Sequence, residues 1–154
     1  RGKMYLDWIA DDLKPWVDGA FRTRTEADFT GIMGYSTGGL FAIYAALARP
    51  DLFSRLAALS SAVYIWKEEL EAFLQRGSYG HLKRIYMDVG TNEFGRITTK
   101  EEFLEGAELM HRAYLEHGVQ PERILYNVYP GAVHSQTDWK MRFPDAIRWI
   151  FGDV

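Results

Sequence analysis

The chain has 154 residues, a net charge of −3, no cysteine, and a composition that is 47% hydrophobic and 15% aromatic. Its length suffices for one domain with a buried core, and its composition is that of a globular protein rather than a disordered one. The lack of cysteine excludes disulfides, thiolate catalysis and cysteine zinc sites, and the weak negative charge gives no basic field for nucleic acid. No membrane-spanning apolar run or signal peptide is visible, so the compartment stays open.

The N-terminal third predicts a helix, a loop, a strand and a second helix. Apolar residues at spacings of three and four predict an amphipathic helix from Tyr5 to about Pro15. A polar loop at 22–28 leads to a strand-like segment at 29–33, and continuous helix formers follow at 40–48. We expect the aromatic side chains with helical spacing to lie in the core rather than in a ligand site: Trp8, Trp16, Phe41 and Trp149.

The rest of the chain alternates between strand-like and helix-like segments. Strands are predicted at 56–60, 84–89 and 123–129, and helices at 66–75, 98–117 and 138–151. A capping box of Thr98 with Glu101, or of Thr99 with Glu102, would begin one helix, and Asp138 would be the N-cap of the last. This alternation predicts an α/β fold, with a parallel sheet and helices on both faces, in a single domain over 1–154.

The most informative motif is Gly34-Tyr35-Ser36-Thr37-Gly38, which lies between a predicted strand and a predicted helix. A serine on a sharp strand-to-helix turn is typical of the nucleophile elbow of α/β-hydrolases, because the tight turn exposes the hydroxyl. Glycine lets the strand and the helix approach closely. The alternative is a glycine-rich turn that merely packs well.

The site of a parallel sheet lies at the carboxyl ends of its strands, and three reactive side chains follow strand ends here. They are Ser36, Glu93 and His134, in the chain order serine, acid, histidine that α/β-hydrolases use. Serine needs a base because its hydroxyl barely ionises at neutral pH; histidine can accept that proton, and a carboxylate can orient the histidine. Asp88, which lies within the end of the strand that precedes Glu93 and could face either side of the sheet, is the alternative acid.

Other candidate groups receive structural interpretations. The acidic residues 101, 102 and 105 are expected on a solvated helix face, and the chain has neither a His-Glu-x-x-His motif nor a phosphate loop, so we expect no metal or cofactor. The remaining histidines are expected on the surface or in packing contacts: His81, His111 and His117.

These residues resemble the Putative esterase family of α/β-hydrolases, which includes esterase D, enterochelin-type esterases and feruloyl or acetyl xylan esterases. The matching segments cover nearly the whole chain: 5–18, 31–40, 50–53, 59–62, 88–93 and 131–134. The family often has methionine after the serine, where this chain has Thr37.

The resemblance implies a serine carboxylester hydrolase that binds a small-molecule ester, forms an acyl-enzyme and uses no cofactor. Ser36 would be the nucleophile, His134 the base and Glu93 the acid, and the N–H of Thr37 would belong to the oxyanion hole. Some enterochelin-type members lack a clear acid, so a Ser–His dyad stays open. The same residues would also suit an acyltransferase of this fold.

The resemblance begins in the middle of the family's domain, which implies that N-terminal strands are missing from this chain. A half sheet leaves an unpaired edge beside the serine strand. We therefore expect the chain to bind an N-terminal fragment or a second copy of itself, which light scattering would detect. The corresponding alternative function is an inactive C-terminal fragment that serves only as a packed or associating module.

Overall fold

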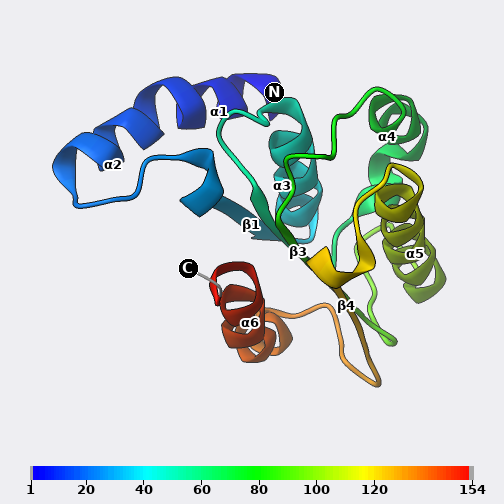
Figure 1. The fold of residues 1–154 in the computed structure, drawn as a ribbon. Helices are drawn as coiled ribbons and strands as arrows, with labels where there is room; N and C mark the ends of the chain where they lie inside the picture. The colour runs from blue at the N-terminus through cyan, green and yellow to red at the C-terminus, as the bar shows by residue number, and fades with distance from the viewer. Residues whose placement is uncertain (1, 153–154) are drawn as a thin grey trace.

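The computed structural model describes residues 2–152, apart from the side chains of residues 67, 68 and 71. Its centre is a parallel sheet of four strands in the order β1-β2-β3-β4, so neighbours in the sheet are also neighbours in the chain (Figure 1). The strands are β1 (Gly31–Tyr35), β2 (Arg55–Leu59), β3 (Arg84–Gly90) and β4 (Ile124–Tyr129). The predicted α/β class with a parallel sheet is confirmed.

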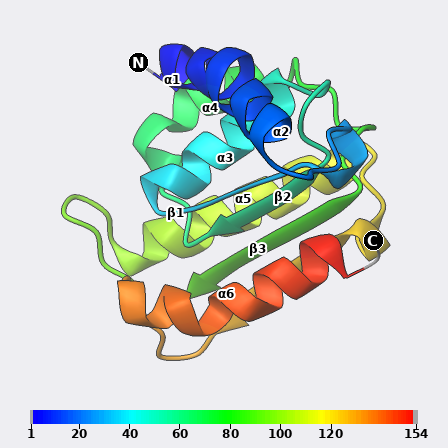
Figure 2. The same ribbon diagram turned by 90° about the vertical axis from the view of Figure 1, so that its left-hand side faces the viewer.

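Helices cover both faces of this sheet. Figures 1 and 2 show α1, α3, α4 and α5 on one face and α6 on the other. The α-helices are α1 (Gly2–Trp8), α2 (Lys14–Ala20), α3 (Thr37–Ala48), α4 (Lys67–Leu74), α5 (Lys100–Glu116) and α6 (Gln136–Phe151). Shorter turns are a π-helical segment (Ile9–Leu13) and 3-10 segments at Ala27–Phe29, Val63–Trp66 and Pro121–Arg123.

The core has two layers because successive residues of a strand point to opposite faces. All five residues of β2 are buried. Leu56 and Ala58 pack with the side chains of α3, α4 and α5, whereas Ala57 and Leu59 pack with those of α6. The middle strands are therefore sandwiched between helices, and this rigid layer carries the loops at the carboxyl ends of the strands.

The N-terminal helix departs from the prediction. It does not end near Pro15 but continues to Ala20, through a π-helical turn in which the N–H of Lys14 donates to the carbonyl of Ile9. The wider turn brings Pro15, which has no N–H to donate, into the following helix. The core prediction is wrong for Trp8 and Trp16, which are 46% and 63% exposed.

The end of the first strand and the start of the last helix also differ from the prediction. The first strand continues to Tyr35, since its pairing with β2 runs on to the residue before Ser36. The last helix begins at Gln136, so Asp138 is not its N-cap; the cap is Ser135, whose hydroxyl accepts from the N–H of Asp138 at 3.2 Å. The capping box of Thr99 with Glu102 is confirmed.

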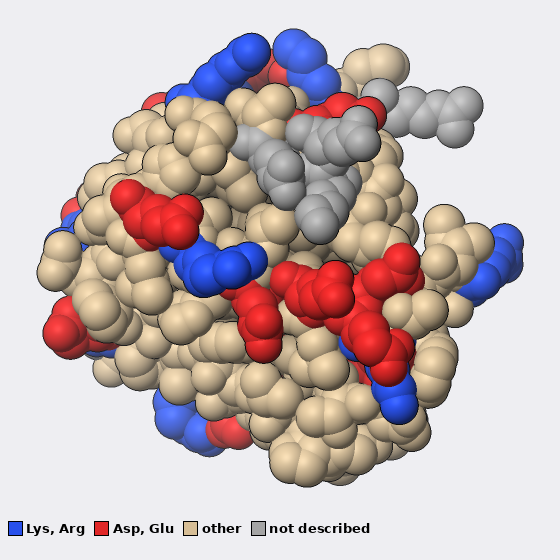
Figure 3. Space-filling view, turned by 90° about the vertical axis from the view of Figure 1, so that its right-hand side faces the viewer, with Lys and Arg blue, Asp and Glu red and all other residues tan. Residues whose placement is uncertain are grey.

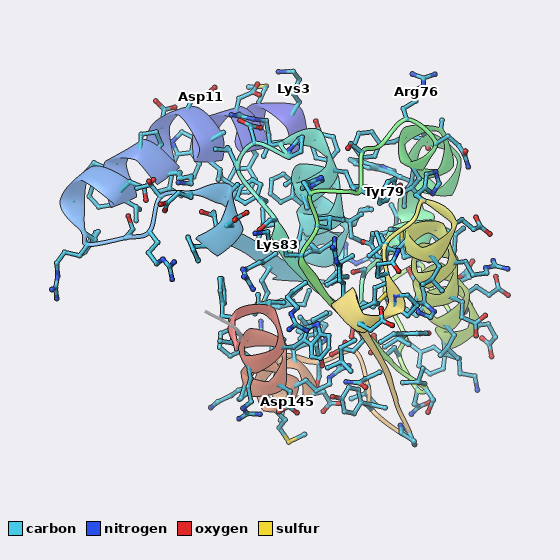
Figure 4. All side chains as sticks on the ribbon, in the orientation of Figure 1. Lys3, Asp11, Arg76, Tyr79, Lys83 and Asp145 are labelled. Atoms are coloured by element: carbon cyan, nitrogen blue, oxygen red, sulfur yellow. The ribbon has the colours of Figure 1, made fainter. Side chains whose placement is uncertain are left out.

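The outer surface of the helices carries both charged and apolar side chains. Figure 3 shows acidic side chains gathered on the face formed by α4 and α5, where Glu101 and Glu105 are exposed. Lys3 and Asp11 project outward from the N-terminal helix and Asp145 from α6 (Figure 4). Within residues 2–152, no helix combines the length and hydrophobicity needed to cross a bilayer. β1 is an edge strand, and none of the described strands pairs with its outer edge.

Candidate active site

Ser36 lies on a sharp turn between β1 and α3, with a left-handed φ of 58° and a ψ of −126°. Two glycines make this turn possible. A β-carbon at Gly34 would lie 2.2 Å from the carbonyl oxygen of Gly38, and one at Gly39 would lie 2.4 Å from the hydroxyl of Ser61. The strand and helix thus cross too closely for a side chain at Gly34, and a side chain at Gly39 would displace that of Ser61.

The backbone of Ser36 is held from two sides. Its N–H donates to the carbonyl of Leu59 at 3.0 Å, and its carbonyl accepts from the N–H of Ala62 at 3.0 Å. Thr37 is the first residue of α3, so its N–H belongs to the helix N-terminal donors that have no acceptor within the helix. A helix N-terminus favours negative charge, so this N–H is available to an anionic group next to Ser36.

The structure brings Ser36, His134 and Glu93 together from the ends of three strands. Nε2 of His134 lies 2.9 Å from Oγ of Ser36, and its Nδ1 lies 2.7 Å from Oε2 of Glu93. The Glu93 side chain is fully buried, and that of His134 is only 12% exposed. A neutral imidazole that donates from Nδ1 presents an unprotonated Nε2 to the serine hydroxyl, as a general base must.

The loop that carries His134 is fixed by the end of β3 and by the start of α6. A β-carbon at Gly90 would lie 2.3 Å from the carbonyl oxygen of Ala132, so glycine allows this close approach. The carboxylate of Asp138 accepts from the N–H of Val133 at 2.6 Å. The imidazole itself lies against the rings of Phe103 and Trp139, with centroids 4.5 Å and 4.7 Å away.

Asp88, the alternative acid, contacts different partners. Its Oδ1 accepts from Nη1 of Arg142 at 2.9 Å and from the N–H of Ser60 at 3.1 Å, and its Oδ2 accepts from the Tyr86 hydroxyl at 2.9 Å. These bonds point Asp88 toward α6, so the structure brings Glu93 rather than Asp88 to His134. Burial raises the pKa of Asp88 to about 6, against the attraction of Arg142, which lowers it.

The other histidines make packing contacts. Nε2 of His81 lies 2.9 Å from the carbonyl oxygen of Ala46, and burial lowers the pKa of His81. The ring of His111 lies 5.0 Å from that of Tyr126, and His117 caps α5. In the part of the chain that the structure describes, no group of three or more potential ligand side chains is arranged to hold a metal ion.

Sequence reasoning missed three polar residues that contact the site: Ser60, Trp139 and Arg142. Ser60 follows β2 directly, and the rule that led to Ser36, Glu93 and His134 applies to it equally. Trp139 and Arg142 lie three residues apart on α6, which is the spacing of neighbours on one helix face. That spacing alone does not tell which strand the face meets.

Two hollows flank the turn at Ser36. One, of about 440 Å³, runs from Thr37 along α3. Its side-chain lining is mainly apolar and aromatic: Lys3, Thr37, Leu40, Phe41, Tyr44, Ile65 and Trp66. The other, of about 710 Å³, lies between β1 and α6 beside Tyr35 and Trp139, whose rings stack with centroids 4.3 Å apart. Apolar parts of a ligand have room on either side of the serine.

The raised pKa of Asp88 predicts a measurable pH dependence of stability. The carboxyl of an unfolded chain has a pKa near 3.8, against about 6 in the folded protein. The contribution of Asp88 to stability is therefore full below pH 3.8 and is lost as the pH rises through about 6, because only the unfolded chain has released the proton in between.

We expect the free energy of unfolding of the unchanged protein, minus that of Asp88→Asn, to fall by up to about 3 kcal/mol across this range. Asparagine is the matched control because it keeps the shape and one acceptor oxygen while carrying no charge. Urea titrations at several pH values between about 4 and about 7 would measure the difference. A difference that stays constant with pH would contradict the raised pKa.

The chain is similar to known proteins over nearly its whole length. The family described as Putative esterase matches residues 2–150. The uncharacterized protein YbbA of Bacillus subtilis (strain 168) is 24% identical over 153 residues, which are 98% of this chain and 60% of YbbA. Enterobactin esterase FES of Shigella flexneri, whose crystal structure was solved in the presence of 2,3-dihydroxy-N-benzoyl-serine, matches with a TM-score of 0.79 and 20% identity, over 97% of this chain and 38% of FES.

FphF, a fluorophosphonate-binding serine hydrolase of Staphylococcus aureus, matches with a TM-score of 0.67 and 18% identity, over 95% of this chain and 63% of FphF. At these identities the two solved structures show a common fold. The chain thus spans 60% of YbbA and 38% of FES, and the family match over residues 2–150 includes Ser36, Glu93 and His134.

Proposed function

This chain belongs to the Putative esterase family, and from that membership we propose that it carries the reacting groups of a serine carboxylester hydrolase. One observation supports this more than any other: the unbroken series of hydrogen bonds from Ser36 through His134 to Glu93, at 2.9 Å and 2.7 Å. A hydroxyl, an imidazole and a carboxylate in this geometry suit nucleophilic attack on an acyl carbon.

In the first half of the proposed reaction, Oγ of Ser36 forms a bond to the acyl carbon while Nε2 of His134 takes the hydroxyl proton. The carbonyl oxygen becomes an oxyanion, for which the N–H of Thr37 is a donor. The proton then passes from His134 to the alcohol oxygen, the ester C–O bond breaks, and the alcohol leaves an acyl-Ser36. Glu93 stabilises the transient imidazolium through Nδ1.

In the second half, a water molecule replaces the alcohol. His134 takes a proton from that water, the resulting oxygen nucleophile attacks the acyl carbon, and the proton returns to Oγ of Ser36 as the acid leaves. The hollow along α3 begins at Thr37, and we propose that it receives the acyl or alcohol part of the ester. FES was crystallised with enterobactin, and FES and this chain share the fold.

The proposal is tested with a fluorophosphonate probe, a reagent class that FphF binds. Activity and labelling are to be measured on the full-length protein, because this chain covers only 38% of FES and 63% of FphF. An activated serine displaces fluoride from phosphorus, and its proton leaves as hydrogen fluoride. We expect one label, at Ser36 by peptide mapping, and none in Ser36→Ala. Esters of increasing acyl size, added as competitors, would measure how much of the hollow a substrate uses.

Ser61→Ala is the matched control for labelling. Ser61 precedes Ala62, whose N–H donates to the carbonyl of Ser36, and the buried hydroxyl of Ser61 has no hydrogen-bond partner. It should therefore not react, and its loss should leave labelling unchanged. A folded protein that takes up no probe, or that takes it up at another residue, would contradict the proposed function.

A further inference from the structure

Glu93 belongs to a buried polar cluster of Ser60, Asp88, Glu93 and Arg142, and the reaction above uses none of the other three members. The exposed fractions of the four residues, in that order, are 0%, 2%, 0% and 4%. The cluster joins the ends of β2 and β3 to α6. Burying two carboxylates and a guanidinium is unfavourable unless each is paired and hydrogen-bonded, so the partners of each group need to be identified.

The hydroxyl of Ser60 uses all of its hydrogen-bonding capacity. It accepts from Nε1 of Trp139 at 2.9 Å and from Nη2 of Arg142 at 3.2 Å, and it donates to Oε1 of Glu93 at 2.6 Å. A hydroxyl has one hydrogen and two lone pairs, so with both lone pairs taken the hydrogen is directed to Glu93. The N–H of Gly90 donates to the same oxygen at 2.6 Å.

Glu93 is thereby held in one orientation. Its Oε1 receives two donated hydrogens, and its Oε2 is left for Nδ1 of His134 at 2.7 Å. If the carboxylate rotated, both buried donors would lose their acceptor, which is costly at a buried site. The two donors to Oε1 thus determine where Oε2 points.

The backbone of Ser60 is strained in the way that the backbone of Ser36 is. Among the described residues these two are the non-glycine residues with positive φ, 46° for Ser60 and 58° for Ser36. The N–H of Ser60 is held by Asp88, through the carbonyl oxygen at 3.0 Å and through Oδ1 at 3.1 Å. Such strain persists only where the surroundings over-determine it, and it concentrates at functional sites.

Arg142 supplies the positive charge of the cluster. Its Nη1 donates to Asp88 at 2.9 Å, and its Nη2 lies 3.6 Å from Oε1 of Glu93. The other groups that face it are the hydroxyl of Tyr86, which donates to Asp88, and the ring of Tyr129, whose centroid is 5.1 Å from the guanidinium carbon. Above about pH 6, where Asp88 is ionised as well as Glu93, one guanidinium leaves these groups a net charge of −1.

We propose that Ser60 and Arg142 are positioning residues for this hydrolase: Ser60 holds Glu93 in the orientation that receives Nδ1–H of His134, and Arg142, paired with Asp88, sets the charge next to that imidazole. This inference rests on the proposed function, since it assigns how the acid of the triad is kept in place. It predicts that a change of charge in the cluster shifts the midpoint of the His134 titration, toward lower pH when a negative charge is removed.

The charge test uses two variants. Asp88→Asn keeps an acceptor for Ser60 and Arg142 but removes a negative charge, so the midpoint of the His134 titration should move to lower pH by roughly one unit. Asp88→Asn combined with Arg142→Met removes both members of the ion pair and restores the net charge of −1. In this double variant the midpoint should return toward that of the unchanged protein. The titration is followed by the imidazole NMR signals of His134 and by the acidic limb of kcat/KM.

The positioning test is Ser60→Ala against Ser61→Ala. Alanine at 60 keeps the β-carbon and hence the backbone strain, so only the hydroxyl is lost. We expect kcat to fall about 10- to 100-fold with KM nearly unchanged in Ser60→Ala, because the loss lies in the chemical step. Ser61→Ala should match the unchanged protein, since its hydroxyl makes no hydrogen bond.

Identical His134 midpoints in the unchanged protein and both charge variants would overturn the role of Arg142, and an unaffected kcat in Ser60→Ala would overturn that of Ser60. Because the NMR titration needs no turnover, it separates the two levels of inference. Midpoints that move as stated in a protein that hydrolyses no ester would support the charge role of Arg142 and refute the proposed function. If Ser60→Ala fails to fold, Ser60→Gly, which relieves the strain at φ 46°, replaces it with the same expected loss of kcat.

Discussion

Replacing Ser36 with alanine should lower kcat for ester hydrolysis by about 10⁴- to 10⁶-fold while leaving the fold intact. The substitution removes only Oγ, the atom that bonds to the acyl carbon and that lies 2.9 Å from Nε2 of His134. The bonds that hold the turn, from the backbone of Ser36 to Leu59 and Ala62, are unaffected. Steady-state hydrolysis of a short-chain aryl ester measures the loss, and turnover near that of the unchanged protein would refute the role of Ser36.

Ser36→Gly is the matched control for the strain of the turn. Glycine adopts a φ of 58° without penalty, so this variant should be as inactive as Ser36→Ala but more stable than it by about 1 kcal/mol. The pair separates the cost of the strained backbone from the chemistry of the hydroxyl. Urea titration of the two variants provides the comparison.

The positions of Ser36, Glu93 and His134 were predictable because each follows the end of a strand. In a parallel sheet all strand ends meet at one edge, so the chain order of strands is enough to place three distant residues near one another. A position at the end of a strand does not determine the direction in which the side chain points. Asp88 lies within the last residues of β3 and Glu93 in the loop that follows, so both are near that edge of the sheet. The structure separates them by their partners: Asp88 accepts from Arg142 of α6, while Glu93 reaches His134.

The unpredicted features depend on how one element lies against another. Hydrophobic spacing indicates which residues share a helix face, but it does not show what covers that face. Trp8 and Trp16 have helical spacing and are nevertheless exposed in the structure. Likewise, the role of Arg142 depends on how α6 is rotated against β2 and β3. This rotation brings its guanidinium close to the carboxylates of Asp88 and Glu93. Such tertiary placement overrides local pattern.

The acid of the triad is expected to be almost as important as the nucleophile. Glu93→Gln should lower kcat/KM by about 10⁴-fold, because an amide cannot satisfy all of the partners of Glu93. If its NH₂ group faced His134, it would favour the tautomer that is protonated at Nε2 and therefore cannot accept the Ser36 proton. If its NH₂ group faced the other way, it would meet the N–H of Gly90, which now lies 2.6 Å from Oε1.

Asp88→Asn, measured at the pH optimum, distinguishes the two acids because it neutralises the neighbouring carboxyl without touching His134. We expect its kcat/KM to stay within about tenfold of the unchanged protein. Since triad members act as a unit, Ser36→Ala combined with Glu93→Gln should be no less active than Ser36→Ala alone. A crippled Asp88→Asn with an active Glu93→Gln would transfer the acid role to Asp88. Near-normal rates in both would indicate that Ser36 and His134 work as a dyad, with the buried carboxylates serving only to bind α6 to the sheet.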